Sequence, residues 1–253
     1  TMDCPEDLTV LRILFSLLNK NFGVLQIINL LKDERNAYIT RINEMPKVTV
    51  YTCNFNQSKY ILDCMKSVQA QTPFNWEHII IDDHSTDDSM NKIMEYRSSL
   101  YPDVQNRVRV YRNDKNIGLP ASCNKALKLA RGKYIIRLDA DDLFLANALS
   151  KMTSELFTHP EWASVYSGYE VTDQDLNPAG RVNFNDAHHP GAAMFRAWAV
   201  NEIKYAEGLQ HFEGLEFHQR FRERYKFGYL KQPLWVYRSH PKSKSRNNLA
   251  ERQ

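Results

Sequence analysis

The chain has 253 residues, of which 43% are hydrophobic and 11% aromatic, which is enough for one sizeable hydrophobic core. Its 33 basic and 30 acidic residues nearly balance, so composition gives no reason to expect a nucleic-acid partner or an anionic membrane surface. The four cysteines form no C-x-x-C pair, which is typical of reduced thiols in a cytosolic protein and argues against a structural zinc site.

The first 46 residues contain two apolar runs with helical character, residues 8–18 and 22–31. Neither approaches the roughly 20 apolar residues that a membrane-spanning helix requires, so the sequence predicts no transmembrane segment. We therefore expect a cytoplasmic protein, and peripheral attachment at the inner face of the membrane stays open. The apolar side chains of these helices need a surface to cover, which makes homodimerisation through them a reasonable hypothesis.

Strands and helices alternate through residues 47–142. Periodicity and turn residues predict strands at 47–53, 77–81, 108–111 and 134–138. They predict helices through residues 61–68, from a capping box at 85–88 to about residue 100, and at 121–130. Such alternation is typical of βαβ units, so the predicted fold class is α/β, with a mostly parallel sheet flanked by helices. After Asp142 the pattern changes to a helix near 146–157, a strand near 164–169, a looser section, a charged helix at 214–226 and a short extended segment at 234–237.

Residues 131–142 are the most informative stretch, because a run suited to a buried strand ends in Asp139, Asp141 and Asp142. Carboxylates crowded at the carboxyl end of a strand repel one another unless a cation lies among them. In open α/β sheets that edge is also where ligands bind. The sequence therefore predicts a metal-dependent enzyme that acts on a nucleoside diphosphate. The alternative for an isolated Asp-x-Asp is a solvated acidic turn that caps the next helix.

Six blocks follow one another along the chain: the strand leading into residues 54–56, residues 79–87, residues 116–124, residues 130–134, residues 139–142 and residues 237–241. This is their order in the GT-A glycosyltransferases of family 2, and the chain resembles that family over residues 46–246. The likeness is close in kind to bacterial enzymes that build surface polysaccharides. It implies a GT-A fold and an inverting, metal-dependent transfer of a sugar from a nucleotide diphosphate sugar, for which we expect a UDP-sugar, to a glycan or lipid-linked glycan acceptor. It also implies that residues 47–142 bind the donor and residues 143–253 the acceptor, within one domain.

The resemblance assigns the donor site residue by residue. In the family, the Asp-x-Asp motif, here Asp139 and Asp141, holds Mn²⁺ or Mg²⁺ against the diphosphate, and the histidine of the Arg-x-His segment, here His240, can approach the metal. The nucleotide-binding residues that it implies are Thr52, Cys53, Asn54, Asn56, Asp83, Asn116, Gly118, Asn124, Asp139 and Arg238.

Two of these residues carry alternatives. A carboxylate accepts but does not donate, so Asp83 favours the imide of uracil as its partner, while capping of the following helix is an interpretation of equal weight. Cys53 stands where the family usually has proline. No basic partner is evident that would lower its pKa, so we interpret it as a packing or base-contacting residue and not as a nucleophile.

The weakest match falls at the general base, which must deprotonate the acceptor hydroxyl. Family members usually carry Glu-Asp at the head of the last large helix, with the aspartate as base, and Gly214 stands in the aspartate's place here. The predicted base is Glu213, with Glu216 second. Negative charge stabilising the start of a helix is the structural alternative for both.

Two further interpretations compete with the transferase assignment. Gly214 keeps open a non-catalytic nucleotide-binding module. A sugar nucleotidyltransferase would need a phosphate-cradling loop that residues 1–60 lack. Residues 1–8 and 42–43 resemble the C-terminal end of spore-coat-type sugar cytidylyltransferases, which would make the chain a piece of a longer bifunctional protein; an ordinary helical extension is the alternative.

Overall fold

The computed structural model describes residues 47–71, 75–182, 193–209, 213–241 and 243. The predicted N-terminal helices, the hypothesis of dimerisation through them and the resemblance to a cytidylyltransferase all fall outside these residues. The strands are β1 (Val48–Asn54), β2 (Trp76–Asp82), β3 (Val108–Arg112), β4 (Tyr134–Arg137), β5 (Leu143–Phe144), β6 (Ser164–Thr172), β7 (Pro178–Val182), β8 (Ala193–Arg196) and β9 (Phe227–Arg238). The helices are α3 (Ile61–Gln69), α4 (Ser89–Ser99), α5 (Pro102–Gln105), α6 (Leu119–Leu129), α7 (Ala148–Thr158), α8 (Ala197–Glu202) and α9 (Glu213–Arg224).

The strands form one sheet in the order β3-β2-β1-β4-β8-β6-β9-β5, and β7 pairs with β6. The first four strands in this order are parallel. Beyond β4 the sheet is mixed, because β8 runs antiparallel to β4 and β6 while β6 and β9 are parallel. The predicted α/β class with flanking helices is confirmed, and the parallel part of the sheet is concentrated in the first half of the chain.

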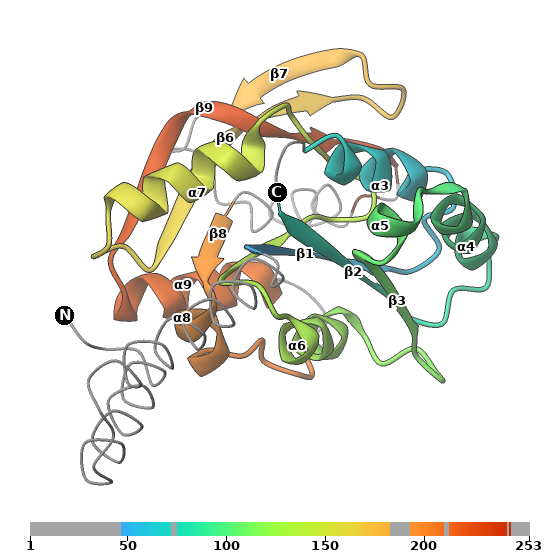
Figure 1. Cartoon of the computed structure of the whole chain (residues 1–253), viewed down its shortest axis with the longest axis horizontal. Coiled ribbons are helices and arrows are strands. Elements are labelled where there is room, and N and C mark those ends of the chain that lie inside the picture. The colour runs from blue at the N-terminus through green and yellow to red at the C-terminus, as the bar shows by residue number, and fades with distance from the viewer. Residues whose placement is uncertain (1–46, 72–74, 183–192, 210–212, 242, 244–253) are drawn as a thin grey trace, which may run out of the picture. The chain divides into compact units, whose positions relative to one another are not determined.

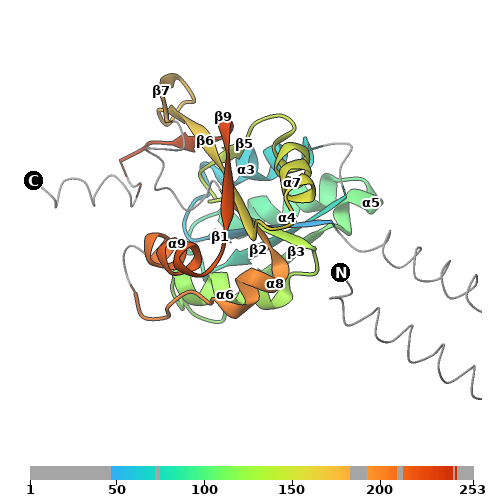
Figure 2. The same ribbon diagram turned by 90° about the vertical axis from the view of Figure 1, so that its left-hand side faces the viewer.

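Helices cover both faces of the sheet, as the two ribbon views show (Figures 1 and 2). On one face, α3, α4 and α7 bury apolar side chains such as Ile61, Ile93 and Leu156 against the sheet. On the other, α6, α8 and α9 do the same with side chains such as Ala126 and Phe217. Hydrophobic layers therefore cover both faces of the sheet, and polar functional side chains are expected at the ends of its strands.

The local sequence explains how α3 packs, where α6 begins and why a glycine precedes β4. In α3 the buried residues Ile61, Cys64, Met65 and Val68 recur at helical spacing, so one stripe of the helix faces the sheet. Helix α6 follows Gly118, whose φ of 85° lies in the left-handed region that glycine adopts without strain, and proline occupies the first turn. Gly132 lies so close to β1 that an added Cβ would be 2.4 Å from the backbone nitrogen of Thr49.

The second half of the chain holds more structure than its sequence pattern predicts. Strand β9 has 12 residues, whereas the sequence predicts an extended segment only at residues 234–237. The section predicted to be loose contains β7, β8 and α8. The last large helix starts at Glu213 and ends at Arg224, close to the predicted bounds.

Candidate donor and transfer site

The carboxyl ends of the parallel strands meet at one edge of the sheet, because β1, β2, β3 and β4 run in the same direction. Asn54 ends β1 opposite Asp82, which ends β2. Asn54 donates through Nδ2 to Asp82 Oδ1 at 2.8 Å and to Ser85 Oγ at 3.0 Å. These buried polar contacts order the strand ends at which nucleotide binding is predicted.

Asp83 is 4% exposed and organises the loop that follows β3. Its Oδ1 accepts hydrogen bonds from Asn113 Nδ2 at 2.8 Å and from the backbone N–H of Ile117 at 2.9 Å. Its Oδ2 accepts one from the backbone N–H of Gly118 at 2.9 Å. With about two lone pairs on each oxygen, one acceptor position on Oδ2 is left for a further donor such as a base imide.

The side chains of Thr52 and Cys53 make contacts inside the protein at the end of β1. Thr52 Oγ1 lies 2.9 Å from His78 Nε2. Cys53 Sγ lies 3.8 Å from Cys123 Sγ, and this contact together with burial raises the pKa of the Cys53 thiol well above its usual range. Of the two roles considered for Cys53, packing and base contact, these contacts support packing, and a thiol with so high a pKa is a poor nucleophile.

The other three asparagines that the resemblance assigns to nucleotide binding form hydrogen bonds with backbone groups. Asn56 Oδ1 accepts from the backbone N–H of Thr86 at 2.8 Å. Asn116 Oδ1 accepts from the N–H of Gly118 at 3.1 Å. Asn124 on α6 binds both the carbonyl and the N–H of Tyr205, at 3.0 and 2.9 Å. These side chains shape the surroundings of the strand ends through contacts inside the protein.

The acidic cluster that follows β4 divides into three environments. Asp139 Oδ1 accepts from Arg137 Nε at 2.6 Å. Asp141 Oδ2 lies 2.9 Å from His240 Nε2, so the structure brings together two motifs that are far apart in sequence. Asp142 is 2% exposed; burial, then the charges of Asp141 and Asp139, raise its pKa well above the usual range.

The segment around His240 is built onto α3 and its preceding turn. The Tyr60 ring centroid lies 4.7 Å from that of His240 and 4.8 Å from the guanidinium carbon of Arg238. Arg238 Nη2 donates to Asp63 Oδ2 at 2.9 Å, while its backbone N–H donates to Asp142 Oδ1 at 2.9 Å. The role of Tyr60 is not visible in the sequence, since an aromatic residue beside an apolar helix stripe gives no signal beyond packing.

Two of the predicted ligands of a divalent metal, Asp141 and His240, therefore meet, while Asp139 faces Arg137. Within the ranges that the structure describes, no three His, Cys, Asp or Glu side chains form a complete metal site. A carboxylate oxygen is a ligand that Mg²⁺ and Mn²⁺ prefer, and an imidazole nitrogen is a common ligand of transition metals. The pair therefore fits a divalent cation whose remaining ligands are substrate phosphates and water.

The two candidate bases at the start of α9 have different partners. Glu216 forms an ion pair with Arg220 of its own helix through two contacts. The Glu213 side chain is 12% exposed, and its Oε1 lies 3.7 Å from Arg137 Nη1. Arg137 also binds Asp139, so Glu213 is the candidate base directed toward the acidic cluster.

Arg137 is a functional candidate that no motif in the sequence singles out. Its side chain is 5% exposed at the end of β4. Burial acts to lower its pKa, but the Asp139, Cys123, Tyr205 and Glu213 groups outweigh burial and raise it well above the usual range. Only its position two residues before Asp139 could have drawn attention to it.

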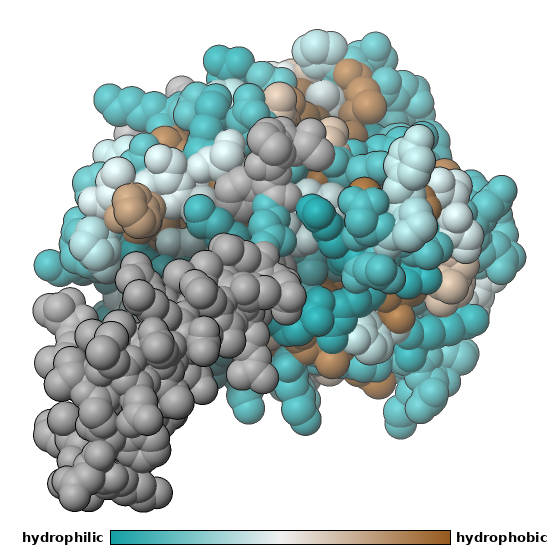
Figure 3. Space-filling model, viewed as in Figure 1, coloured by the Kyte–Doolittle hydropathy of each residue, from teal (hydrophilic) through white to brown (hydrophobic). Residues whose placement is uncertain are grey.

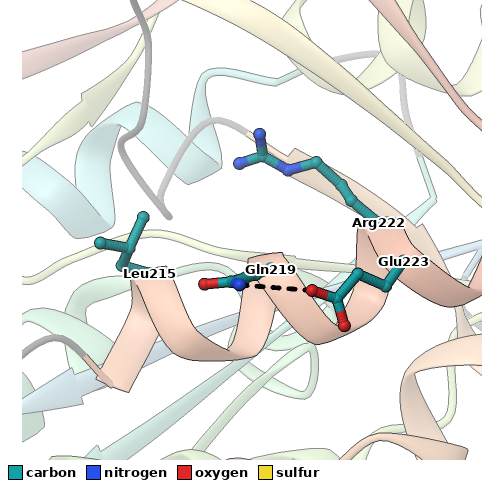
Figure 4. A pocket seen from close by; sticks show the side chains of 4 residues that line it. All are labelled: Leu215, Gln219, Arg222 and Glu223. Atoms are coloured by element: carbon teal, nitrogen blue, oxygen red, sulfur yellow. Dashed lines mark hydrogen bonds between the residues drawn. The ribbon is translucent and has the colours of Figure 1, made fainter.

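Two hollows border these elements. One, of about 350 Å³, lies along α9 and is lined by Leu215, Gln219, Arg222 and Glu223; Figure 4 shows the Arg222 guanidinium turned away from the hydrogen-bonded Gln219 and Glu223. The other, of about 680 Å³, lies between β5, β9 and the β6–β7 hairpin. Brown, hydrophobic residues gather over that hairpin on a face that is otherwise mostly hydrophilic (Figure 3).

Among the helices that the structure describes, none is long and apolar enough to span a membrane.

Two curated relatives with related functions match about half of this chain. It is 34% identical to "Putative teichuronic acid biosynthesis glycosyltransferase TuaG" of Bacillus subtilis over 54% of this chain and 52% of that protein. It is 30% identical to "UDP-Glc:alpha-D-GlcNAc-diphosphoundecaprenol beta-1,3-glucosyltransferase WfgD" of Escherichia coli over 51% of this chain and 47% of that protein. The chain thus matches only about half the length of either relative.

Solved structures share the fold at low identity. S. aureus TarS 1-349 in complex with UDP-GlcNAc aligns with a TM-score of 0.61 at 18% identity, covering 78% of this chain and 60% of that one. The mannosyltransferase PcManGT from Pyrobaculum calidifontis, in complex with GDP-Man and Mn²⁺, aligns with a TM-score of 0.66 at 15% identity, covering 82% and 61%. The model of the family described as "Glycosyl transferase family 2" matches residues 49–229, which is most of the chain, and the protein therefore belongs to glycosyl transferase family 2.

Proposed function

We propose that this protein is a metal-dependent, inverting glycosyltransferase that moves a sugar from a UDP-sugar to a hydroxyl group of a glycan in bacterial surface polysaccharide synthesis. The observation that carries the proposal is the meeting of Asp141 with His240 at the strand-end edge where Arg137 links Asp139 to Glu213. One relative is named for teichuronic acid biosynthesis and another for glucosyl transfer from UDP-Glc, and a solved structure of similar fold binds UDP-GlcNAc.

The donor would bind at the carboxyl ends of β1, β2 and β4. Asp141 and His240 would hold Mn²⁺ or Mg²⁺, which when bound stabilises the charge that develops on the departing diphosphate. Arg238, fixed between Tyr60 and Asp63, lies in the same segment as His240 and supplies positive charge beside the phosphates. The open acceptor position on Asp83 Oδ2 would take the imide N–H of uracil.

Transfer requires a base on the acceptor side. Glu213 would accept the proton of the acceptor hydroxyl as its oxygen attacks the anomeric carbon. The bond between that carbon and the diphosphate oxygen breaks on the opposite face, so the configuration inverts and the nucleoside diphosphate leaves with the bonding electrons. Glu216 is the weaker candidate, since Arg220 occupies its carboxylate.

A catalytically weakened nucleotide-binding module is the second candidate function. Gly214, in the place where the family usually has its aspartate, is the observation that favours it. Such a module would bind the nucleotide with metal and release no product, so binding and turnover have to be measured separately.

Binding is tested by calorimetry with UDP, GDP, CDP and TDP, with and without Mn²⁺, on the full chain. We expect metal-dependent binding of UDP that Asp141→Ala abolishes. Asp103→Ala is the matched control, because this aspartate lies in the short helix α5. Absence of binding to all four nucleotides would reject the proposed donor site.

Turnover is tested by release of UDP from UDP-sugars in the presence of oligosaccharide acceptors. We expect Glu213→Gln to lower kcat by about 100-fold or more, whereas Glu216→Gln has a much smaller effect. UDP binding without any release of UDP would favour the binding module.

A further inference from the structure

Arg137 is a buried cation between two carboxylates that come from separate parts of the chain. It ends β4 with a side chain that is 5% exposed. A guanidinium out of water is costly unless carboxylates and hydrogen bonds compensate. Asp139, in the loop after β4, and Glu213, at the start of α9, provide that compensation.

The contacts of Arg137 with these two carboxylates differ in kind. Nε makes a short, charge-assisted hydrogen bond of 2.6 Å to Asp139 Oδ1. Nη1 lies 3.7 Å from Glu213 Oε1 and has no hydrogen-bond partner among the described residues. The Glu213 carboxylate is thus attracted to Arg137 without a hydrogen bond from Nη1, and no described residue occupies the lone pairs that an acceptor hydroxyl would use.

A buried pair that only stabilises the fold looks different in this protein. Glu77 is surrounded by donors: Thr49 Oγ1 at 2.7 Å, Arg109 Nη1 at 2.8 Å and the backbone N–H of Arg131 at 2.8 Å. Each of these partners is within hydrogen-bond distance. The long contact between Arg137 and Glu213 instead orients a carboxylate without saturating it.

The backbone of Glu213 is already fixed by packing, so Arg137 acts on the direction of its side chain. Phe217 and Phe221 anchor α9 in the hydrophobic core, and Tyr205 stacks on Phe217 with ring centroids 4.3 Å apart. From that fixed backbone the Glu213 side chain, which is 12% exposed, brings its Oε1 to 3.7 Å from Arg137 Nη1.

We propose that Arg137, itself fixed by its hydrogen bond to Asp139, is a positioning residue that directs the Glu213 carboxylate toward the acidic cluster. This inference rests on the proposed role of Glu213 in transfer. Arg137 touches neither the acceptor nor the sugar in this role and acts through the Glu213 carboxylate.

The test is a double-mutant cycle with Arg137→Met, Glu213→Gln and the double variant, in which UDP release and UDP binding are both measured. We expect Arg137→Met to lower kcat by about 100-fold with little change in donor KM, because a misplaced base costs about that much. If Arg137 acts through Glu213, the double variant is no more than about twofold slower than Glu213→Gln alone. Arg137→Lys should recover about tenfold of the loss, since an ammonium keeps the charge but lacks the planar fork. Arg181→Met, which removes an exposed pair with Glu170, is the control expected to leave the rate unchanged.

Independent losses that multiply in the double variant, or a raised donor KM with unchanged kcat, would overturn the inference. Failure of the proposed function is distinguishable, because the wild-type chain would then release no UDP while the cycle can still be read from thermal unfolding. There, a double variant that melts within about 1 °C of the less stable single variant indicates coupling of the two residues. Additive shifts would reject the coupling whether or not the protein transfers sugar.

Discussion

Replacement of Asp83 by asparagine should destabilise the protein through the loop between β3 and α6. The carboxylate accepts three hydrogen bonds, from Asn113 Nδ2 and from the backbone N–H groups of Ile117 and Gly118. An amide keeps one acceptor oxygen and places an NH₂ group where the other oxygen was, so at least one buried donor then faces a donor. Loss of a charge-assisted bond and an unsatisfied donor together cost about 2–4 kcal/mol. This is a large fraction of the roughly 5–15 kcal/mol that stabilises a typical domain.

The measurement is urea unfolding of Asp83→Asn beside Asp88→Asn. Asp88 is the matched control, because it is exposed and accepts one side-chain hydrogen bond from Asn91. Its substitution should change the free energy of unfolding by less than about 0.5 kcal/mol. Equal effects of the two substitutions, or an effect of Asp83→Asn below about 0.5 kcal/mol, would show that the loop does not depend on this carboxylate.

Three further outcomes follow from packing and burial. Burial lowers the pKa of His78 to about 3, so on acidification the unfolded state binds a proton at this histidine before the folded state does. The free energy of unfolding should therefore fall by up to about 1.4 kcal/mol per pH unit as the pH drops from about 6.5 toward about 3. Urea unfolding of the wild type and of His78→Gln at a series of pH values measures this contribution. Gly132→Ala should lower the free energy of unfolding by about 1–3 kcal/mol, because the added Cβ would meet Thr49. Gly180→Ala, whose Cβ would have no atom within 4 Å, should lower it by less than about 0.5 kcal/mol in the same assay. Cys53 should react with iodoacetamide near pH 8 far more slowly in the folded chain than in urea, as mass spectrometry of the modified peptide will report, because its pKa is raised.

The first half of the fold could be predicted because its signals are local. Strand β2, with all seven residues buried, contains the apolar run Ile79–Ile81, and α3 shows a clear helical stripe. Strands β7 and β9 lack such patterns. All but one residue of β7 are exposed, and β9 contains Pro233 and two irregularities in its pairing with β6. Those strands exist because neighbouring strands pair with them, which a single segment of sequence does not reveal.

Site residues could be predicted from the sequence where short motifs contain them. They could not be predicted where their role depends on contacts between segments that are far apart in the sequence. The resemblance to a family suggested that His240 would approach the metal held by Asp141, and the two side chains lie 2.9 Å apart. For Asn54, Asn56 and Asn124 the motif match named the residues but not their partners, which are groups inside the protein. Arg137 carried no motif, since an arginine inside a strand is usually interpreted as a solvent-facing residue.

Helix geometry explains why a carboxylate at position 213, and not one at position 214, can act as the base at the start of α9. Successive residues of a helix point about 100° apart, so a one-residue shift changes what a side chain faces. Gly214 is buried at the centre of the face of α9 that carries Phe217, His218 and Phe221, so a carboxylate added there would enter that face, whereas Glu213 lies at its edge. Glu213 instead faces Arg137 and the acidic cluster. In this chain, therefore, the position beside the family's usual aspartate is the one from which a carboxylate can serve transfer without burying an unpaired charge in the core, and this supports Glu213 as the base over a loss of activity.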